Sequence, residues 1–235
     1  MRNTEIKNRL ALFAAALREA KLDLYLVPMV DAFQSEYIPD SAARLPYLTG
    51  FTGSAGLGAF WAAAYDAQRH SLFVDGRYTI QAVQEVDADS IAVLNSGDVS
   101  LGAWLKEHAT PGVRIGVDPW LVTVEQLARW QEATQSLGVE WVLPATNLVD
   151  AVWEDRPTEP ASAAALHPLE YAGVSYAEKR APIVEMMHAR GLDSLILAQP
   201  DGINWLLNLR GGDIPFNPLL LSYLILQKDG NATLF

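Results

Sequence analysis

The sequence predicts an α/β fold in which one structural unit is used twice and the second copy is incomplete. Predicted strands and helices alternate through the first two thirds of the chain, which favours a parallel or mixed sheet flanked by helices. The pattern of the first helix and strand then recurs after residue 175. Half of the 235 residues are hydrophobic and 19% are charged, which is typical of folded domains and unlike disordered or collagen-like chains.

Hydrophobic spacing assigns the elements of the first copy. Ile6, Leu10, Phe13 and Leu17 recur at intervals of three and four residues, which predicts an amphipathic helix. Further helices are expected over 78–85, 101–108 and 123–137, the last with Thr123 as N-cap and Gly138 at its end. Strands are expected over 22–27, 57–65, 71–75, 91–94, 113–117 and 139–143, with a hairpin turn at 66–69 and an irregular stretch over 29–43.

A change in composition separates the two copies. Residues 154–168 contain three prolines and a run of alanine and serine at 161–165, which is typical of a linker. We therefore expect a first domain over residues 1–155, a linker over 156–174 and a partial second domain over 175–235. In the second domain, the pattern predicts a helix over 177–190 and a strand over 192–198.

The two copies correspond motif by motif. Residues 18–28 match 187–198, residues 47–53 match 205–211, and a hairpin with its turn at 228–230 follows in the second copy. The second copy reaches residue 235 inside its second hairpin strand, whereas the first continues well beyond its hairpin. An uncovered apolar face and strand edge favour aggregation, so we expect the chain to be a fragment of a longer protein.

Charge and composition exclude several function classes. The net charge of −11 and the pI near 4.7 argue against nucleic acid as the main partner, because phosphate binding requires a basic surface. The absence of cysteine excludes disulfides, thiolate catalysis and cysteine-ligated zinc. Neither a secretory signal nor an apolar run of membrane-spanning length is visible. We expect a cytoplasmic protein with no membrane partner.

Two constellations that can carry chemistry are better explained by structure. The four histidines are scattered, and Glu185 with His188 on one helical face lacks the facing carboxylates that a di-iron type of site requires. The glycines at 50, 53, 56 and 58 lack dinucleotide-binding spacing, and residues 52–56 only partly resemble a nucleophile elbow because a threonine stands first and a strand follows. We expect no catalytic residue and no metal ligand in this chain.

Two motifs carry a family resemblance over essentially the whole chain. Residues 40–56 (DSAARLPYLTGFTGSAG) and 73–78 (FVDGRY) resemble the first N-terminal domain of Xaa-Pro aminopeptidases, also called aminopeptidase P. Residues 204–214 (NWLLNLRGGDI), with Asn217 and Pro218, resemble the second N-terminal domain of the three-domain branch of that family. The resemblance implies a duplicated creatinase-type N-terminal domain, a mixed sheet flanked by helices, with the second copy truncated.

The resemblance also implies where the chemistry lies. Members of this family release the N-terminal residue before proline with two metal ions, usually manganese, held by a third, pita-bread domain that this chain lacks. The chain alone is therefore expected to be inactive and to hold no cofactor. Its expected partners are its own C-terminal catalytic domain, proline-containing peptides and a second copy in a homodimer.

By the same resemblance, Arg210, Asp213 and Asn217 lie in a loop that faces the catalytic domain. Two roles are open. Arg210 and Asp213 could form a buried pair that shapes the loop, or one of them could line the approach to the active site, since a guanidinium recognises carboxylate and carbonyl groups. The region is then expected to shape access and support dimerisation. The alternative is a non-enzymatic, peptidase-like module that binds protein partners.

Overall fold

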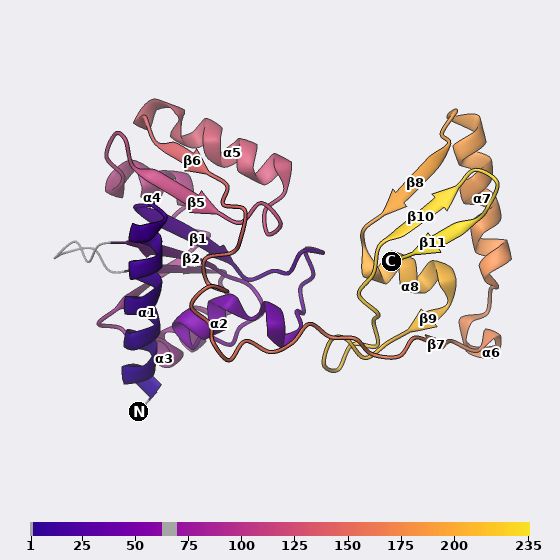
Figure 1. Ribbon diagram of the computed structural model, residues 1–235, viewed down its shortest axis with the longest axis horizontal. Coiled ribbons are helices and arrows are strands. Elements are labelled where there is room, and N and C mark those ends of the chain that lie inside the picture. The colour runs from indigo at the N-terminus through magenta and orange to yellow at the C-terminus, as the bar shows by residue number, and fades with distance from the viewer. Residues whose placement is uncertain (1, 63–69) are drawn as a thin grey trace. The chain divides into compact units, whose positions relative to one another are not determined.

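The computed structural model describes residues 2–62 and 70–235. The chain divides into two compact units, Met1–Pro157 and Thr158–Phe235, each with its own hydrophobic core (Figure 1). The turn predicted at 66–69 lies outside the described residues. Within the described ranges, no helix combines the length and the apolar character that crossing a membrane requires.

The first unit contains a six-stranded sheet with the order β4-β3-β2-β1-β5-β6. β2 is antiparallel to both neighbours, and every other pairing is parallel. All strands except β2 therefore end at one common edge of the sheet. Their bounds are β1 (Leu24–Pro28), β2 (Leu57–Trp61), β3 (His70–Val74), β4 (Ile91–Asn95), β5 (Arg114–Val117) and β6 (Glu140–Val142).

Helices cover both faces of this sheet, because successive residues of a central strand point to opposite sides. In β1, Tyr25 and Val27 pack in one core with α1, α2 and α3, while Leu24 and Leu26 pack in another with α4 and α5. The expected mixed sheet flanked by helices is confirmed. The helices are α1 (Arg2–Glu19), α2 (Arg44–Thr49), α3 (Thr79–Glu85), α4 (Leu101–His108) and α5 (Val124–Thr134).

Local signals define α5 well and α2 poorly. The Thr123 hydroxyl accepts a hydrogen bond from the amide of Gln126, and Gly138 is left-handed (φ 65°) after a short 3-10 turn, so both predicted ends are confirmed. α2 has only six residues and was not expected from the sequence. It forms because the fully buried Leu45 and Leu48 anchor it in the core.

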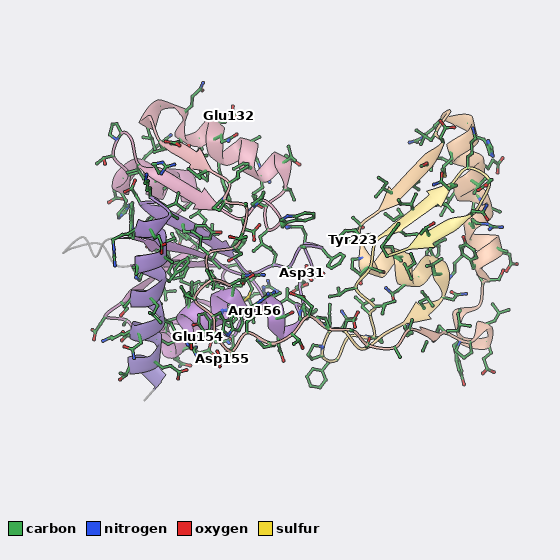
Figure 2. The ribbon with its side chains drawn as sticks, viewed as in Figure 1. Asp31, Glu132, Glu154, Asp155, Arg156 and Tyr223 are labelled. Carbon is green, nitrogen blue, oxygen red and sulfur yellow. The ribbon has the colours of Figure 1, made fainter. Side chains whose placement is uncertain are left out.

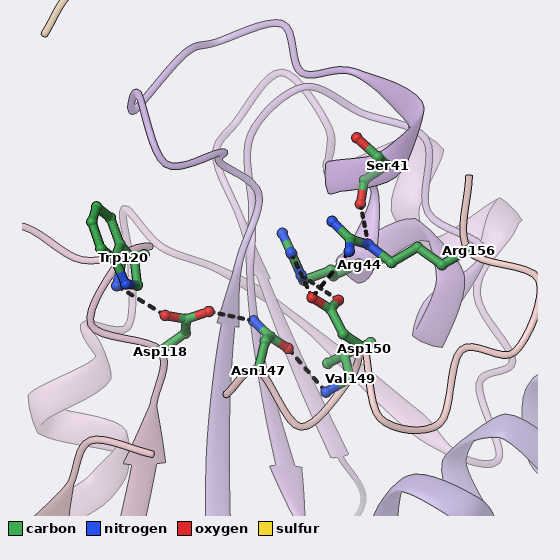
Figure 3. A network of polar contacts seen from close by, with 8 residues as sticks. All are labelled: Ser41, Arg44, Asp118, Trp120, Asn147, Val149, Asp150 and Arg156. Carbon is green, nitrogen blue, oxygen red and sulfur yellow. Dashed lines mark hydrogen bonds and ion pairs between the residues drawn. The ribbon is translucent and has the colours of Figure 1, made fainter. Parts of the chain in front are cut away.

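A polar network fixes the last segment of the first unit (Figure 3). The Arg44 guanidinium donates from Nε and Nη2 to the two carboxylate oxygens of Asp150, at 2.7 and 2.8 Å. Arg156 forms a further ion pair with Asp150 at 3.5 Å and donates to the carbonyl oxygen of Ser41 at 2.8 Å. Charged hydrogen bonds, and not strand pairing, therefore hold the segment that follows β6 against the start of α2.

The second unit is a three-stranded antiparallel sheet with the order β11-β10-β8, against which α7 and α8 pack. Ser175 and Glu178 form a capping box at the start of α7. The segment expected as a linker contains β7 (Ala165–Leu166) and α6 (Leu169–Ala172), and β7 pairs with β9 (Leu209–Arg210). The remaining elements are α7 (Tyr176–Ala189), β8 (Ser194–Leu197), α8 (Pro200–Leu207), β10 (Leu224–Gln227) and β11 (Ala232–Leu234).

The internal repeat extends to backbone detail. The order α1-β1-α2-β2-β3 corresponds to α7-β8-α8-β10-β11, with antiparallel strand pairs in both. After the first helix of each copy, a residue is left-handed, Lys21 (φ 55°) and Gly191 (φ 66°). The following amide then donates to the carbonyl five residues earlier at 2.9 Å in both copies. The second helices also end left-handed, at Gly50 and Asn208.

The left-handed backbone at Lys21 predicts a stabilising substitution. A residue with a Cβ atom is disfavoured there and glycine is not. Lys21→Gly should therefore raise the free energy of unfolding by about 0.5–1 kcal/mol, and Gly191→Lys should lower it by a similar amount. Denaturant unfolding followed by tryptophan fluorescence measures both changes. A loss of stability on Lys21→Gly would contradict the expectation.

Candidate functional site

The loop after α8 contains the residues expected near an active site. Asn208 ends α8 in the left-handed conformation (φ 52°), and β9 then pairs with β7. Further on, the amides of Gly211 and Asp213 donate to the carbonyls of Pro218 and Leu219, at 3.3 and 3.1 Å. Main-chain hydrogen bonds therefore connect the two ends of the loop and fix the backbone from which its side chains extend.

Asp213 holds this loop together. The residue is 5% exposed, and its Oδ1 accepts from the amide of Ser162 at 2.9 Å while its Oδ2 accepts from the amide of Leu221 at 2.7 Å. The Ser162 hydroxyl in turn accepts from the amide of Gly212 at 2.7 Å. One carboxylate therefore joins the loop to a segment 51 positions earlier and to one 8 positions later. A buried carboxylate with two amide donors is a strong structural group.

The structure does not join Arg210 to Asp213. Among the described residues, no ion pair links these two side chains, and the Arg210 guanidinium donates to the carbonyl of Leu209 at 2.7 Å. The residue is half-buried. Backbone amides, and not the Arg210 guanidinium, therefore bind the Asp213 carboxylate. The Arg210 side chain stays partly accessible to other groups.

Asn217 lies next to the tip of the loop. Its amide donates to the carbonyl of Ile214 at 3.2 Å, and its own carbonyl accepts from the amide of Leu219 at 2.7 Å. The neighbouring Phe216 is fully exposed and has a left-handed backbone (φ 61°). Phe216 is therefore an exposed aromatic residue at a strained position of the loop. It was not expected there, because no local pattern marks a phenylalanine as exposed.

A buried lysine supports the start of the loop. Lys179 is 7% exposed, donates to the carbonyl of Trp205 at 2.7 Å and to Oδ1 of Asn208, and lies 4.5 Å from the centre of a Trp205 ring. In the first unit, Arg9 donates to the carbonyl of Tyr47 at 3.1 Å and lies 4.3 Å from that ring. Each unit thus places a cation at the C-terminal end of its second helix, where the helix dipole favours it.

The histidines of the described residues form no metal site. No group of three or more potential metal ligands occurs in residues 2–62 and 70–235. His70 is half-buried at the start of β3, its Nδ1 accepts from the amide of Trp61 at 3.2 Å, and desolvation lowers its pKa to about 4. His108 stacks on Trp104. Both histidines are therefore packing residues.

Close packing explains the glycines before and at the start of β2. A Cβ atom at Gly53 would lie 2.2 Å from the ring of Phe51, and one at Gly58 would lie 2.2 Å from the ring of Phe60. The Ser54 hydroxyl lies 2.8 Å from the Tyr78 hydroxyl, and its hydrogen bonds within the described residues involve no histidine base. The segment therefore has a steric role and lacks the geometry of a serine nucleophile.

The geometry defines a class: a tandem α/β module in which a six-stranded mixed-sheet unit precedes a smaller copy of its first half. Residues 9–152 match a family model described as the creatinase/prolidase N-terminal domain, and residues 155–235 match a second model with the same description. The chain therefore belongs to the creatinase/prolidase N-terminal domain family.

Relatives match along almost the whole chain. A protein from Ajellomyces capsulatus called probable Xaa-Pro aminopeptidase P is 36% identical over 95% of this chain, and aminopeptidase P2 of Arabidopsis thaliana is 35% identical over 91%. The crystal structure of an X-prolyl aminopeptidase from Caenorhabditis elegans, described as a cytosolic enzyme with a di-nuclear active site, superposes with a TM-score of 0.87 over 98% of this chain at 29% identity. The chain spans 36%, 30% and 38% of these three proteins.

Proposed function

We propose that this chain is the N-terminal, non-catalytic region of a metal-dependent Xaa-Pro aminopeptidase. The observation that carries the proposal is the match to curated Xaa-Pro aminopeptidases over 95% of the chain at 36% identity. Both units match in the same order, which supports common descent of the whole region with these aminopeptidases and not of one domain alone.

In this proposal the chemistry belongs to another part of the parent protein. The described residues contain no cluster of three or more metal ligands, so they do not fit a di-nuclear centre. A pair of metal ions, which we propose to be manganese, supplies a hydroxide nucleophile when bound in such a centre. This chain then has the C-terminal catalytic domain as its partner, shapes access of proline-containing peptides, supports a homodimer and works in the cytoplasm.

Peptidase assays on the longer protein and on this chain test the proposal. The longer protein with Mn²⁺ should hydrolyse an Ala-Pro peptide, and this chain alone should not. Removal of the metal with a chelator should abolish the activity. A longer protein that stays inactive with added metal, and binds a protein partner instead, would favour the non-enzymatic module.

Arg210 is the loop residue proposed to contact substrate. Its guanidinium is partly accessible and is free of an ion pair to Asp213, so it can donate to a peptide carbonyl or carboxylate. In the parent enzyme, Arg210→Ala should raise KM for Xaa-Pro peptides about fivefold to tenfold with little change in kcat, as the loss of one charged hydrogen bond predicts. Arg210→Lys should recover part of the loss. Unchanged kinetics in a folded variant would refute the role.

A further inference from the structure

Two hollows lie at the edge of the first unit's sheet where all strands except β2 end. The larger, about 470 Å³, lies among the loops after β1, β3 and β5, the segment before β2, and the first turn of α5. The smaller, about 260 Å³, lies among the loops after β3 and β4 and the start of α4. Both share residues 55–57, so they flank one chain segment. Ligands of α/β proteins commonly bind at this edge.

The lining of the larger hollow suits an extended peptide. Apolar, uncharged polar and charged side chains together line it. Apolar side chains pack against prolyl and aliphatic groups, while amides and hydroxyls bond to a peptide backbone. The residues that supply these groups are Met29, Val30 and Leu121 on the apolar side and Gln34, Ser35 and Gln126 on the polar side.

The loops at this edge carry most of the net negative charge of the chain. They contain nine carboxylates and two guanidinium groups, which is a net charge of −7 against −11 for the whole chain. A concave surface whose surrounding loops have a net charge of one sign attracts ligands of the opposite sign within about 8 Å at physiological ionic strength. The ranges counted are 29–43, 50–56, 75–78, 96–100, 118–123 and 143–157.

Glu36 is the carboxylate best placed to meet a cation in the larger hollow. Arg77 donates from Nε to Oδ1 of Asp75 at 3.1 Å and from Nη2 to Oδ2 at 2.8 Å, and this contact lowers the pKa of Asp75, so these two charges offset each other. The contacts of Glu36 are longer, at 3.5 Å to Arg77 and 3.4 Å to the Ser54 hydroxyl, and its side chain is 56% exposed. Such loose contacts are exchanged for a ligand at small cost.

A buried carboxylate adds to the negative potential beside this lining. Asp31, in the loop after β1, is 4% exposed (Figure 2). Its Oδ1 accepts from the amides of Phe33 and Ser35 at 3.0 and 2.9 Å, and its Oδ2 has no hydrogen-bond partner among the described residues. No cation neutralises Asp31 within the ion pairs of the described residues. A buried, half-paired carboxylate projects its charge more strongly than an exposed one.

We propose that this edge of the first unit is a secondary binding site for a positively charged peptide in an extended conformation. Glu36 contacts a basic side chain or ammonium group, the apolar residues of the lining receive prolyl or aliphatic side chains, and Gln34 and Gln126 bond to the backbone. The idea that the bound peptide is a substrate of the parent rests on the proposed function. The binding itself is a property of this unit.

Calorimetric titration of the 235-residue chain with two matched peptides tests the proposal. Ala-Pro-Lys-Ala-Lys-Ala should bind with a Kd at least about tenfold lower than Ala-Pro-Glu-Ala-Glu-Ala at physiological salt. Glu36→Gln should weaken the basic peptide about threefold to fivefold, as the loss of one partly exposed ion pair predicts. Gln126→Trp, which fills the larger hollow, should abolish binding. Equal affinity for the two peptides would overturn the proposal.

Glu132→Gln is the matched control, because it removes the same charge from the exposed surface of α5 (Figure 2). It should leave the affinity unchanged, and an effect equal to that of Glu36→Gln would indicate only diffuse attraction by the net charge. The outcome is separate from the peptidase assay on the longer protein. Binding without peptidase activity supports this site and refutes the proposed function, and activity without binding does the reverse.

Discussion

Replacing Asp213 with alanine is expected to lower the free energy of unfolding of the second unit by about 3 kcal/mol, because each lost hydrogen bond to a charged acceptor contributes about 1.5 kcal/mol or more. The substitution leaves the amides of Ser162 and Leu221 without their acceptor in a partly buried place. Amide hydrogen exchange measures the effect directly, and the protection of these two amides should fall by two orders of magnitude.

Asp201→Ala is a suitable control for this measurement. Asp201 is also an aspartate of the second unit, but it is exposed at the start of α8. Its removal should change stability by no more than about 0.5 kcal/mol. Equal effects of the two substitutions would show that Asp213 is not the structural centre of the loop. In the parent enzyme, Asp213→Ala should also disturb any function of Arg210, since both residues belong to one loop.

Replacing Arg44 with methionine is expected to destabilise the first unit by about 3 kcal/mol, because it leaves Asp150 partly unpaired in a partly buried network. The two hydrogen bonds at 2.7 and 2.8 Å are lost, and Arg156 remains as a weaker partner at 3.5 Å. Urea unfolding measures the change. Limited proteolysis should also cleave the segment after β6 faster, because this network holds it in place (Figure 3).

Arg129→Met is the matched control, because it removes an arginine from a pair with Glu125 that is largely exposed at 3.7 Å. Exposed pairs of this kind contribute about 0.3–0.5 kcal/mol. The contrast between the two substitutions therefore separates a buried network from a surface pair. If Arg44→Met unfolds at the same urea concentration as Arg129→Met, the network does not stabilise the unit.

The sequence by itself determined the elements whose signals are local. The spacing of Ile6, Leu10, Phe13 and Leu17 defines one face of α1, and all four side chains are buried. Thr123 caps α5 by a hydrogen bond from an amide only three residues later. The repeat was also visible in the sequence, since corresponding motifs occur in the same order in both copies. It extends to the left-handed backbone at Lys21, a conformation that no propensity scale predicts for a lysine.

Tertiary structure decided the features that depend on contacts between distant residues. α8 is eight residues long and was not expected, and it forms because Ile203 and Leu206 are buried against the sheet of the second unit. The partners of Asp213 lie 51 and 8 positions away, so the sequence favoured the nearby Arg210 instead. A carboxylate takes whichever donors the folded chain brings within reach, and local spacing does not contain that information.

The same reason applies to the hollows of the first unit. Their lining comes from the four loops after β1, β3, β4 and β5 and from the segment before β2, and only the order and direction of the strands bring these segments to one edge. Sequence order places Met29 and Gln126 nearly a hundred residues apart, yet they line one hollow. The periodicity of side chains reports only on residues that are close along the chain. A binding surface consists of residues that are close in space, and burial of the hydrophobic core determines which residues those are.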